Sequence, residues 1–157
     1  MACRRVVAVG DVRAARAGVD AASRAWELLG DDPDASGGRI GFLVYGLDQQ
    51  LESSRANLSA LEGRFADSED RLGAVQRTAP TVHHQVLVLA QIGRVRAKAG
   101  SPEGACEALV AGLDLAEPAG YTMGVQRIRG VRDRFSKPWV ALTCVRALDE
   151  RLGPRAL

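Results

Sequence analysis

The residues of this chain that could do chemistry are few, and their spacing does not suit catalysis or metal binding. His83 and His84 are adjacent, and neighbouring helical residues point about 100° apart, so their rings cannot chelate one metal as an i, i+4 pair would. One solvated and one partly packed histidine is the favoured interpretation. The chain has no G-x-S-x-G, no H-E-x-x-H and no Cys/His pair suited to nucleophilic catalysis. We therefore expect a protein that is not an enzyme and that uses no metal or cofactor.

Two segments have a weak resemblance to ion-binding loops. Gly41 and Gly46 have the glycine spacing of a phosphate-binding loop, but Leu47 and Asp48 follow where Lys and Ser/Thr must contact phosphate and magnesium. No predicted strand precedes them. The aspartates of the segment 31–34 could offer calcium oxygens, yet no bidentate Glu follows at the spacing of an EF-hand. We reject the phosphate loop and interpret the aspartates as a solvated loop.

The strongest basic run consists of Arg127, Arg129, Arg132 and Arg134. On a helix these residues divide between two faces, with Arg127 and Arg134 seven residues apart on one and the other two on the second. The run could bind an acid. A solvated face, with Asp133 alongside, is the favoured alternative.

Composition is that of an ordinary globular protein. The chain has 157 residues, of which 46% are hydrophobic and 25% charged, which is typical of one domain with a packed core. A net charge of +2 is far from the basic excess of a protein that binds nucleic acid by charge. No apolar stretch approaches the roughly 20 residues of a membrane helix, and no signal-peptide core follows the N-terminus. We expect a soluble cytoplasmic protein that contacts neither membrane nor nucleic acid.

The cysteines and tryptophans are expected to be packing residues. Cys3, Cys106 and Cys144 are odd in number and far apart in the sequence, which suggests neither a disulfide framework nor a zinc site. Small buried thiols are the favoured interpretation. Trp26 and Trp139 are more typical of a core or of a hairpin contact than of a platform for bases.

Apolar residues recur at spacings of three and four along the whole chain, which predicts helices separated by glycine and proline breaks. The first stripe runs from Val12 to Leu29. Ser101 followed by Pro102 reads as an N-cap with proline at the first helical position. The further stripes span Ile40–Leu61, Phe65–Val75, Val82–Ile92, Ala105–Ala116, Tyr121–Phe135 and Leu142–Leu152.

A repeat underlies this pattern. Gly63 is followed nine residues later by Leu72, and the same arrangement recurs with Gly100 and Leu109, 37 residues further along. In each case a glycine ends one helix and a leucine lies inside the next. Gly10 is interpreted in the same way. Repeated helix–glycine–helix hairpins are typical of a solenoid, in which each hairpin buries its apolar face against its neighbours.

The best hairpin resembles a tetratricopeptide repeat. Ile92-Gly93 matches the apolar and small pair that lets two helices approach, Gly100 lies at the turn, and Ala105, Leu109 and Gly112 match the second helix. The resemblance implies an all-α fold, an antiparallel helical-hairpin solenoid of seven or eight helices.

The hairpin that starts at Gln49 departs from the family pattern. Glu52 and Arg55 occupy places that the family fills with apolar residues. In the better hairpin, Arg96 stands where an aromatic residue is common.

The C-terminal third, in the segments Gly120–Phe135, Pro138-Trp139 and Val145–Leu152, is similar to the end of tetratricopeptide-bearing helix-turn-helix transcriptional regulators of the XRE type in actinobacteria. In that family a DNA-binding domain precedes a helical sensor region. This chain matches only the sensor region. We expect residues 1–157 to form one domain that is truncated on its N-terminal side, because Met1–Val9 is too short for the first helix of a hairpin.

The resemblance implies a non-enzymatic interaction module, the sensor or dimerisation region of such a regulator. Its partner would be a protein or peptide, or an acidic small molecule, and a homodimer stays open. In the family, ligand-facing side chains come from the first helix of each hairpin. Transferred to this chain, those places hold Gln50, Ser53, Asn57 and Leu61 in one hairpin and Leu87, Ala90, Arg94 and Lys98 in the next. Asn57, Arg94 and Lys98 would then converge on one concave face, where an amide and two cations suit a carboxylate or phosphate. For the site, the alternative is three solvated polar residues on a helix surface. For the function, the alternatives are a scaffold protein unrelated to transcription and, third, an enzyme that modifies a small molecule.

Overall fold

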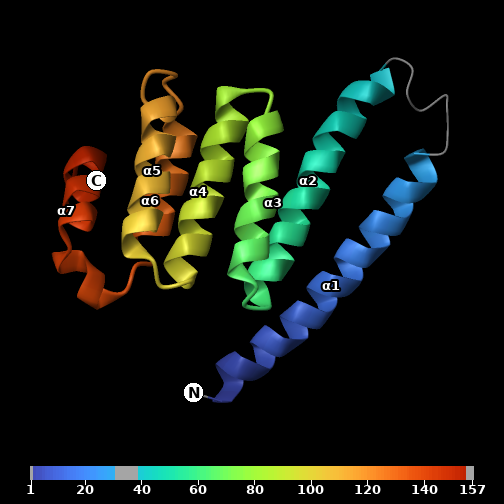
Figure 1. The fold of residues 1–157 in the computed structure, drawn as a ribbon, viewed down its shortest axis with the longest axis horizontal. Helices are drawn as coiled ribbons and strands as arrows, with labels where there is room; N and C mark the ends of the chain where they lie inside the picture. Colours follow the sequence, from blue (N-terminus) through green and yellow to red (C-terminus); the bar gives the residue numbers. More distant parts are fainter. Residues whose placement is uncertain (1, 31–38, 155–157) are drawn as a thin grey trace. The chain divides into compact units, whose positions relative to one another are not determined.

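The computed structural model describes the backbone of residues 2–30 and 39–154, and the side chains of 12–25, 27 and 49–154 (Figure 1). All regular structure in these two ranges is helical, which confirms the predicted all-α class. The helices are α1 (Ala2–Gly30), α2 (Arg39–Leu61), α3 (Phe65–Thr78), α4 (Val82–Lys98), α5 (Pro102–Ala116), α6 (Thr122–Arg132), the 3₁₀ helix η2 (Lys137–Ala141) and α7 (Thr143–Leu152).

The chain divides into two compact units, Met1–Arg71 and Leu72–Leu157, with the boundary inside α3. The expected single domain spans both units and stays a prediction. Among the helices of the described ranges, none combines the length and the apolar character that a bilayer crossing needs.

Glycine turns follow three of the helices, and the repeat predicts two of them, at Gly63 and Gly100. Gly63, Gly100 and Gly120 have φ of 79°, 85° and 62°, a region that favours glycine. At Gly100 the glycine amide donates to the carbonyl of Ala97 at 3.2 Å, and the next amide donates to the carbonyl of Arg96 at 3.0 Å. The same pair of bonds closes the turns at Gly63 and Gly120. These are Schellman motifs, and they bond the last carbonyls of each helix.

The leucines of the repeat lie where their spacing places them. Leu72 and Leu109, each nine residues after its turn glycine, are both fully buried. The helix–glycine–helix arrangement is therefore confirmed for Gly63 and Gly100.

The third predicted hairpin, at Gly10, is wrong, because Gly10 lies inside the continuous helix α1. An isolated glycine costs a helix only about 1 kcal/mol relative to alanine, and no proline adjoins Gly10 to stop the helix. Of the predicted stripe on α1, Val12, Ala15 and Val19 are half-buried and Ala22 is exposed.

Some sequence predictions concern residues outside the described part of the chain, and another concerns a segment that is helical. The aspartates of 31–34 and the side chains of Cys3, Trp26 and Leu29 lie outside the described residues. Gly41 and Gly46 lie within α2, so the backbone there is helical and does not form a phosphate loop.

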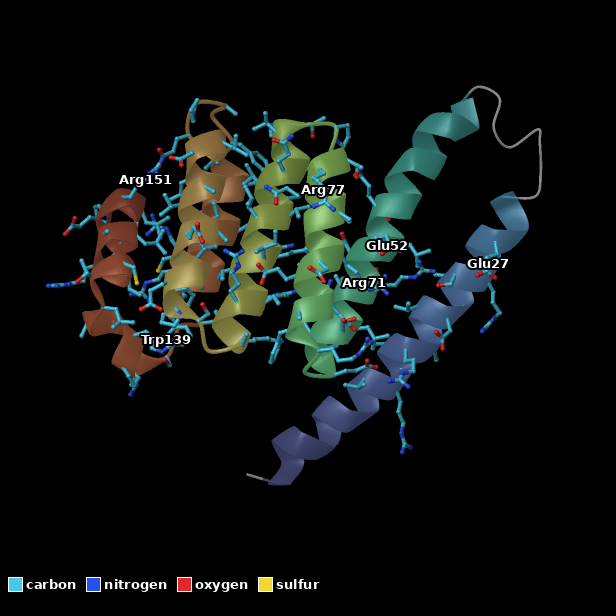
Figure 2. All side chains as sticks on the ribbon, in the orientation of Figure 1. Glu27, Glu52, Arg71, Arg77, Trp139 and Arg151 are labelled. Atoms are coloured by element: carbon cyan, nitrogen blue, oxygen red, sulfur yellow. The ribbon has the colours of Figure 1, made fainter. Side chains whose placement is uncertain are left out.

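In the first unit, the charged residues that depart from the tetratricopeptide pattern form a polar network. Glu52 of α2 accepts a hydrogen bond from Arg71 of α3 at 2.9 Å and pairs with Arg55 on its own helix (Figure 2). Arg55 also donates to Oγ of Ser23 on α1 at 2.8 Å. Polar contacts thus join α2 to both neighbouring helices where the family uses apolar ones.

The second unit is built on the antiparallel pair α4 and α5, against which α6 and then α7 pack (Figure 1). The two helices of the pair approach closely at Gly93, where an added Cβ would lie 2.7 Å from Cδ2 of Leu109 and 3.3 Å from the carbonyl of Ala105. The core of this unit consists of Val86, Ala90, Ala105, Cys106, Leu109, Leu113, Ala116, Ile128, Val131, Phe135, Val145 and Leu148.

Arg96 takes the place of the aromatic residue that is common in the repeat. Its side chain crosses from α4 to α5, donating to the carbonyl of Gly104 at 3.1 Å and pairing with Glu107 at 3.2 Å. Gly104 makes this possible, because a Cβ there would lie 3.2 Å from Cδ of Arg96. Ser101 is the N-cap of α5 with Pro102 at the first helical position, as predicted, although its hydroxyl makes no capping hydrogen bond.

Candidate ligand-binding face on α4 and α6

Much of helix α4 is buried, and one of its faces carries a row of polar side chains. Its buried residues are Val86, Val88, Leu89, Ala90, Ile92, Gly93 and Val95. Gln91, Arg94 and Lys98 follow one another at spacings of three and four residues, so they share one face. Gln91 and Arg94 are half-buried and Lys98 is exposed.

One residue that the tetratricopeptide resemblance places on the ligand-facing side does not lie on the polar face of α4. The tetratricopeptide alignment assigns Ala90 to the ligand-facing side, but Ala90 is only 1% exposed and belongs to the core. Gln91 occupies the polar face instead. A shift of one residue on a helix rotates the side chain by about 100°, which is enough to exchange a core position for a surface one.

Two further cations come from α6 and the turn that follows it. Helices α4 and α6 pack against each other in the second unit. Burial, and then the charges of Arg127 and Arg134, lower the pKa of the Arg94 guanidinium. Burial, and then the charges of Arg94 and Arg134, lower the pKa of Lys98. Charge interactions thus link Arg94 to the other three cations, and we call Arg94, Lys98, Arg127 and Arg134 the basic face.

Space is left open on the α6 side of the basic face. Gly130 lies between Arg127 and Arg134 at helical spacings of three and four, so it shares their side of the chain. A Cβ built on Gly130 meets no atom within 4 Å. A ligand group can therefore approach the α6 backbone between the two arginines.

Gln91 adds a neutral acceptor beside these cations. Its Oε1 is buried and has no hydrogen-bond partner among the described residues. A buried amide oxygen without a partner is costly, and it is satisfied by an N–H or O–H donor. The arrangement suits a ligand that presents an anionic group to the cations and a donor to Gln91.

The other two arginines of the run face α7. Arg132 forms a two-pronged ion pair with Asp149, at 2.7 and 2.6 Å. Arg129 donates to the carbonyls of Leu152 and Gly153 at the end of α7, the latter at 3.1 Å. The predicted division of the run between two faces is confirmed. The expectation of a solvated face is wrong for Arg129 and Arg132, which hold the last helix in place.

The three residues selected from the sequence lie in different units. Asn57 is half-buried on α2 in the first unit, whereas Arg94 and Lys98 lie one turn apart on α4 in the second. The structure brings Arg94 and Lys98 together, and the convergence of Asn57 with them stays a prediction. Sequence reasoning missed Gln91 and did not connect Arg127 and Arg134 to this face. The signal in the sequence was the seven-residue spacing of Arg127 and Arg134, which equals the spacing of Gln91 and Lys98 on α4.

Both histidines are exposed, and His83 and Trp139 make ring contacts. The ring of His83 lies against Tyr121 with centroids 4.3 Å apart, and the amide of His84 donates to the N-cap Thr81 at 3.3 Å. Trp139 packs edge-on to Phe135 with centroids 5.4 Å apart (Figure 2). No group of three or more His, Cys, Asp or Glu side chains able to hold a metal ion occurs in the part of the chain described here.

Comparison of the chain with protein-family models, with curated proteins and with solved structures gives no match.

Proposed function

We propose that this chain is a non-enzymatic interaction module that binds an acidic group of a peptide, protein or small molecule on the basic face. The observation that supports this is the grouping of four cations, in which burial first, and then the charges of neighbouring cations, lower the pKa of both Arg94 and Lys98. An anion placed among them would relieve the repulsion and would accept charge-assisted hydrogen bonds.

The pKa of Arg94 shifts in the opposite direction from that of another arginine of the same unit. Arg151 forms ion pairs with Glu117 and Asp114, at 2.9 and 2.7 Å, and these carboxylates raise its pKa. At Arg94 burial, and then the charges of Arg127 and Arg134, lower the pKa. An anion bound on the basic face would add negative charge, which favours the protonated guanidinium.

By resemblance, the module would be the sensor or dimerisation region of a helix-turn-helix regulator. Binding on the first helices of the hairpins would shift their packing and so alter an attached DNA-binding domain in a full-length relative. A scaffold unrelated to transcription is the alternative. A helix-turn-helix reading frame directly upstream of this gene would favour the regulator, and its absence would favour the scaffold.

Fluorescence anisotropy with a short fluorescein-labelled polyglutamate peptide tests the binding proposal, with pyrophosphate as a competing probe and a neutral peptide of equal length as the reference. We expect the acidic peptide to bind and the neutral one not to bind. Arg94→Ala should weaken binding by roughly tenfold or more, which corresponds to the 1.5–3 kcal/mol of a charge-assisted hydrogen bond. Competition by pyrophosphate would indicate a preference for phosphate groups.

Arg146→Ala is the matched control, since Arg146 is an exposed arginine of α7 in the same unit and lies outside the basic face. It should leave the affinity unchanged. Equal loss of affinity in both variants would show attraction by overall charge, and unchanged affinity in Arg94→Ala would move the ligand to another surface. Either result contradicts the proposal.

A further inference from the structure

Two cysteines that are distant in the sequence meet in the core of the second unit. Cys106 lies in the second turn of α5 and is only 3% exposed. Cys144 lies in the first turn of α7, is half-buried and packs against the same core cluster. The side chain of Cys144 interacts with that of Cys106 strongly enough to shift its pKa.

The register of the two helices holds these thiols together. Eight residues after Cys106, Asp114 of α5 pairs with Arg151 of α7 at 2.7 Å, and Arg151 lies seven residues after Cys144. Contacts at corresponding points two turns apart mean that α5 and α7 run side by side in the same direction. The bidentate pair of Arg132 with Asp149 fixes α7 between those two points.

We propose that Cys106 and Cys144 form a reversible intramolecular disulfide that ties α7 to α5 when the protein meets a small-molecule disulfide such as oxidised glutathione. The bond is a modification site independent of the acid-binding function proposed above. The geometry that favours the bond is the packing of α5 on α7, with Cys106 and Cys144 at corresponding points of the two helices and beside the same core.

The chemistry proceeds by two thiol–disulfide exchanges. The Cys144 thiolate attacks one sulfur of oxidised glutathione, forms a mixed disulfide and releases one glutathione thiolate. The Cys106 sulfur then attacks the Cys144 sulfur, and the second glutathione leaves as a thiolate that takes up the Cys106 proton. The two protein thiols thereby lose two electrons and two protons, and one oxidised glutathione becomes two reduced ones.

The two cysteines have different roles in this sequence. Burial and the interaction with Cys144 raise the pKa of Cys106 to about 12, so Cys106 stays protonated and is unreactive toward an external reagent. Cys144 is the more exposed of the two and is the point of entry. Cys106 reacts second because the mixed disulfide is held beside it on α7.

The bond would close a loop from residue 106 to residue 144, which constrains the unfolded chain more than it constrains the native one. For a loop of this length, chain-entropy arguments predict a rise in melting temperature of about 5–15 °C on oxidation.

The experiment uses the full chain carrying Cys3→Ser, so that Cys106 and Cys144 are the remaining cysteines. The folded protein is incubated with oxidised glutathione, free thiols are blocked with iodoacetamide, and tryptic peptides are examined by mass spectrometry with and without reduction. We expect a peptide pair linked through Cys106 and Cys144. The melting temperature should rise on oxidation and return to its starting value with dithiothreitol.

Cys106→Ala in the same background is the matched control, because it keeps Cys144 as the entry point and removes its partner. It should stop at the mixed disulfide with glutathione and should show no rise in melting temperature. A persistent mixed disulfide in the protein that retains both cysteines, or two fully alkylated cysteines after oxidation, would overturn the proposal. So would a linkage that forms only between two chains.

Discussion

Gly93 and Leu109 meet where α4 and α5 come closest, and the glycine leaves no space for a side chain. A Cβ on Gly93 would lie 2.7 Å from Cδ2 and 2.9 Å from Cγ of Leu109. Leu109 is fully buried and cannot withdraw into solvent. Gly93→Leu should therefore force the helices apart, at a cost of about 1–3 kcal/mol or more in the free energy of unfolding. Urea denaturation measures this loss.

Gly130→Ala is the control for that substitution, because it changes a helical glycine of the same unit that faces open space. It should stabilise the protein by about 0.5–1 kcal/mol through helix propensity alone. Equal free energies of unfolding for Gly93→Leu and Gly130→Ala would contradict the close approach of α4 and α5 at Gly93.

Arg129→Ala should weaken the attachment of α7. The substitution removes two hydrogen bonds to the carbonyls of Leu152 and Gly153, where a cation also interacts favourably with the helix dipole. We expect a loss of about 1–2 kcal/mol in stability. Hydrogen exchange should show faster exchange of the α7 amides, with α4 and α5 little changed. Uniform acceleration over all of these helices would contradict a local role in docking α7.

Gly130→Glu should abolish acid binding without unfolding the protein. The carboxylate would occupy the open space between Arg127 and Arg134 and neutralise part of the basic face. Glutamate is also a better helix former than glycine, so the melting temperature should not fall. Gly130→Gln supplies the same volume without the charge and should retain most of the affinity. Peptide titration of both variants distinguishes neutralisation of charge from blockage of space.

Binding to duplex DNA should be weak despite the basic face. Four cations can neutralise about four phosphates, and each contact is weakened as salt rises. The chain as a whole has a net charge of only +2. A gel-shift titration at physiological salt should show no sub-micromolar, sequence-selective complex. Such a complex would indicate a nucleic-acid interface that the described residues do not suggest.

Helix positions could be predicted from the sequence because their ends are determined locally. Gly63, Gly100 and Gly120 adopt positive φ, which other residues rarely do, and the turn chemistry is therefore visible in the sequence. Gly10 shows the limit of that inference. A glycine that no proline or second glycine adjoins can equally well lie inside a helix, and the neighbouring residues determine whether the helix ends there.

The candidate site was predictable only in part, because its pieces come from helices far apart in the sequence. Arg94 and Lys98 share a face of one helix, which spacing reveals. That Arg127 and Arg134 turn toward α4 while Arg129 turns toward α7 depends on how α6 packs, and helical periodicity alone cannot say which neighbour each face meets. Whether Asn57, which lies in the other unit, converges with Arg94 and Lys98 likewise depends on packing that helical periodicity does not reveal.

The glycine turn at Gly100 has a consequence for the kinetics of folding. It joins α4 and α5 through a few residues, so the largest contact of the second unit forms between segments that are neighbours in the sequence. Closing so short a loop costs little entropy, and folds dominated by local contacts reach the native state in microseconds to milliseconds. The α4–α5 pair is therefore the natural nucleus of this unit. Helices α6 and α7 would then add to it in chain order, and substitutions in α7 would mainly speed unfolding.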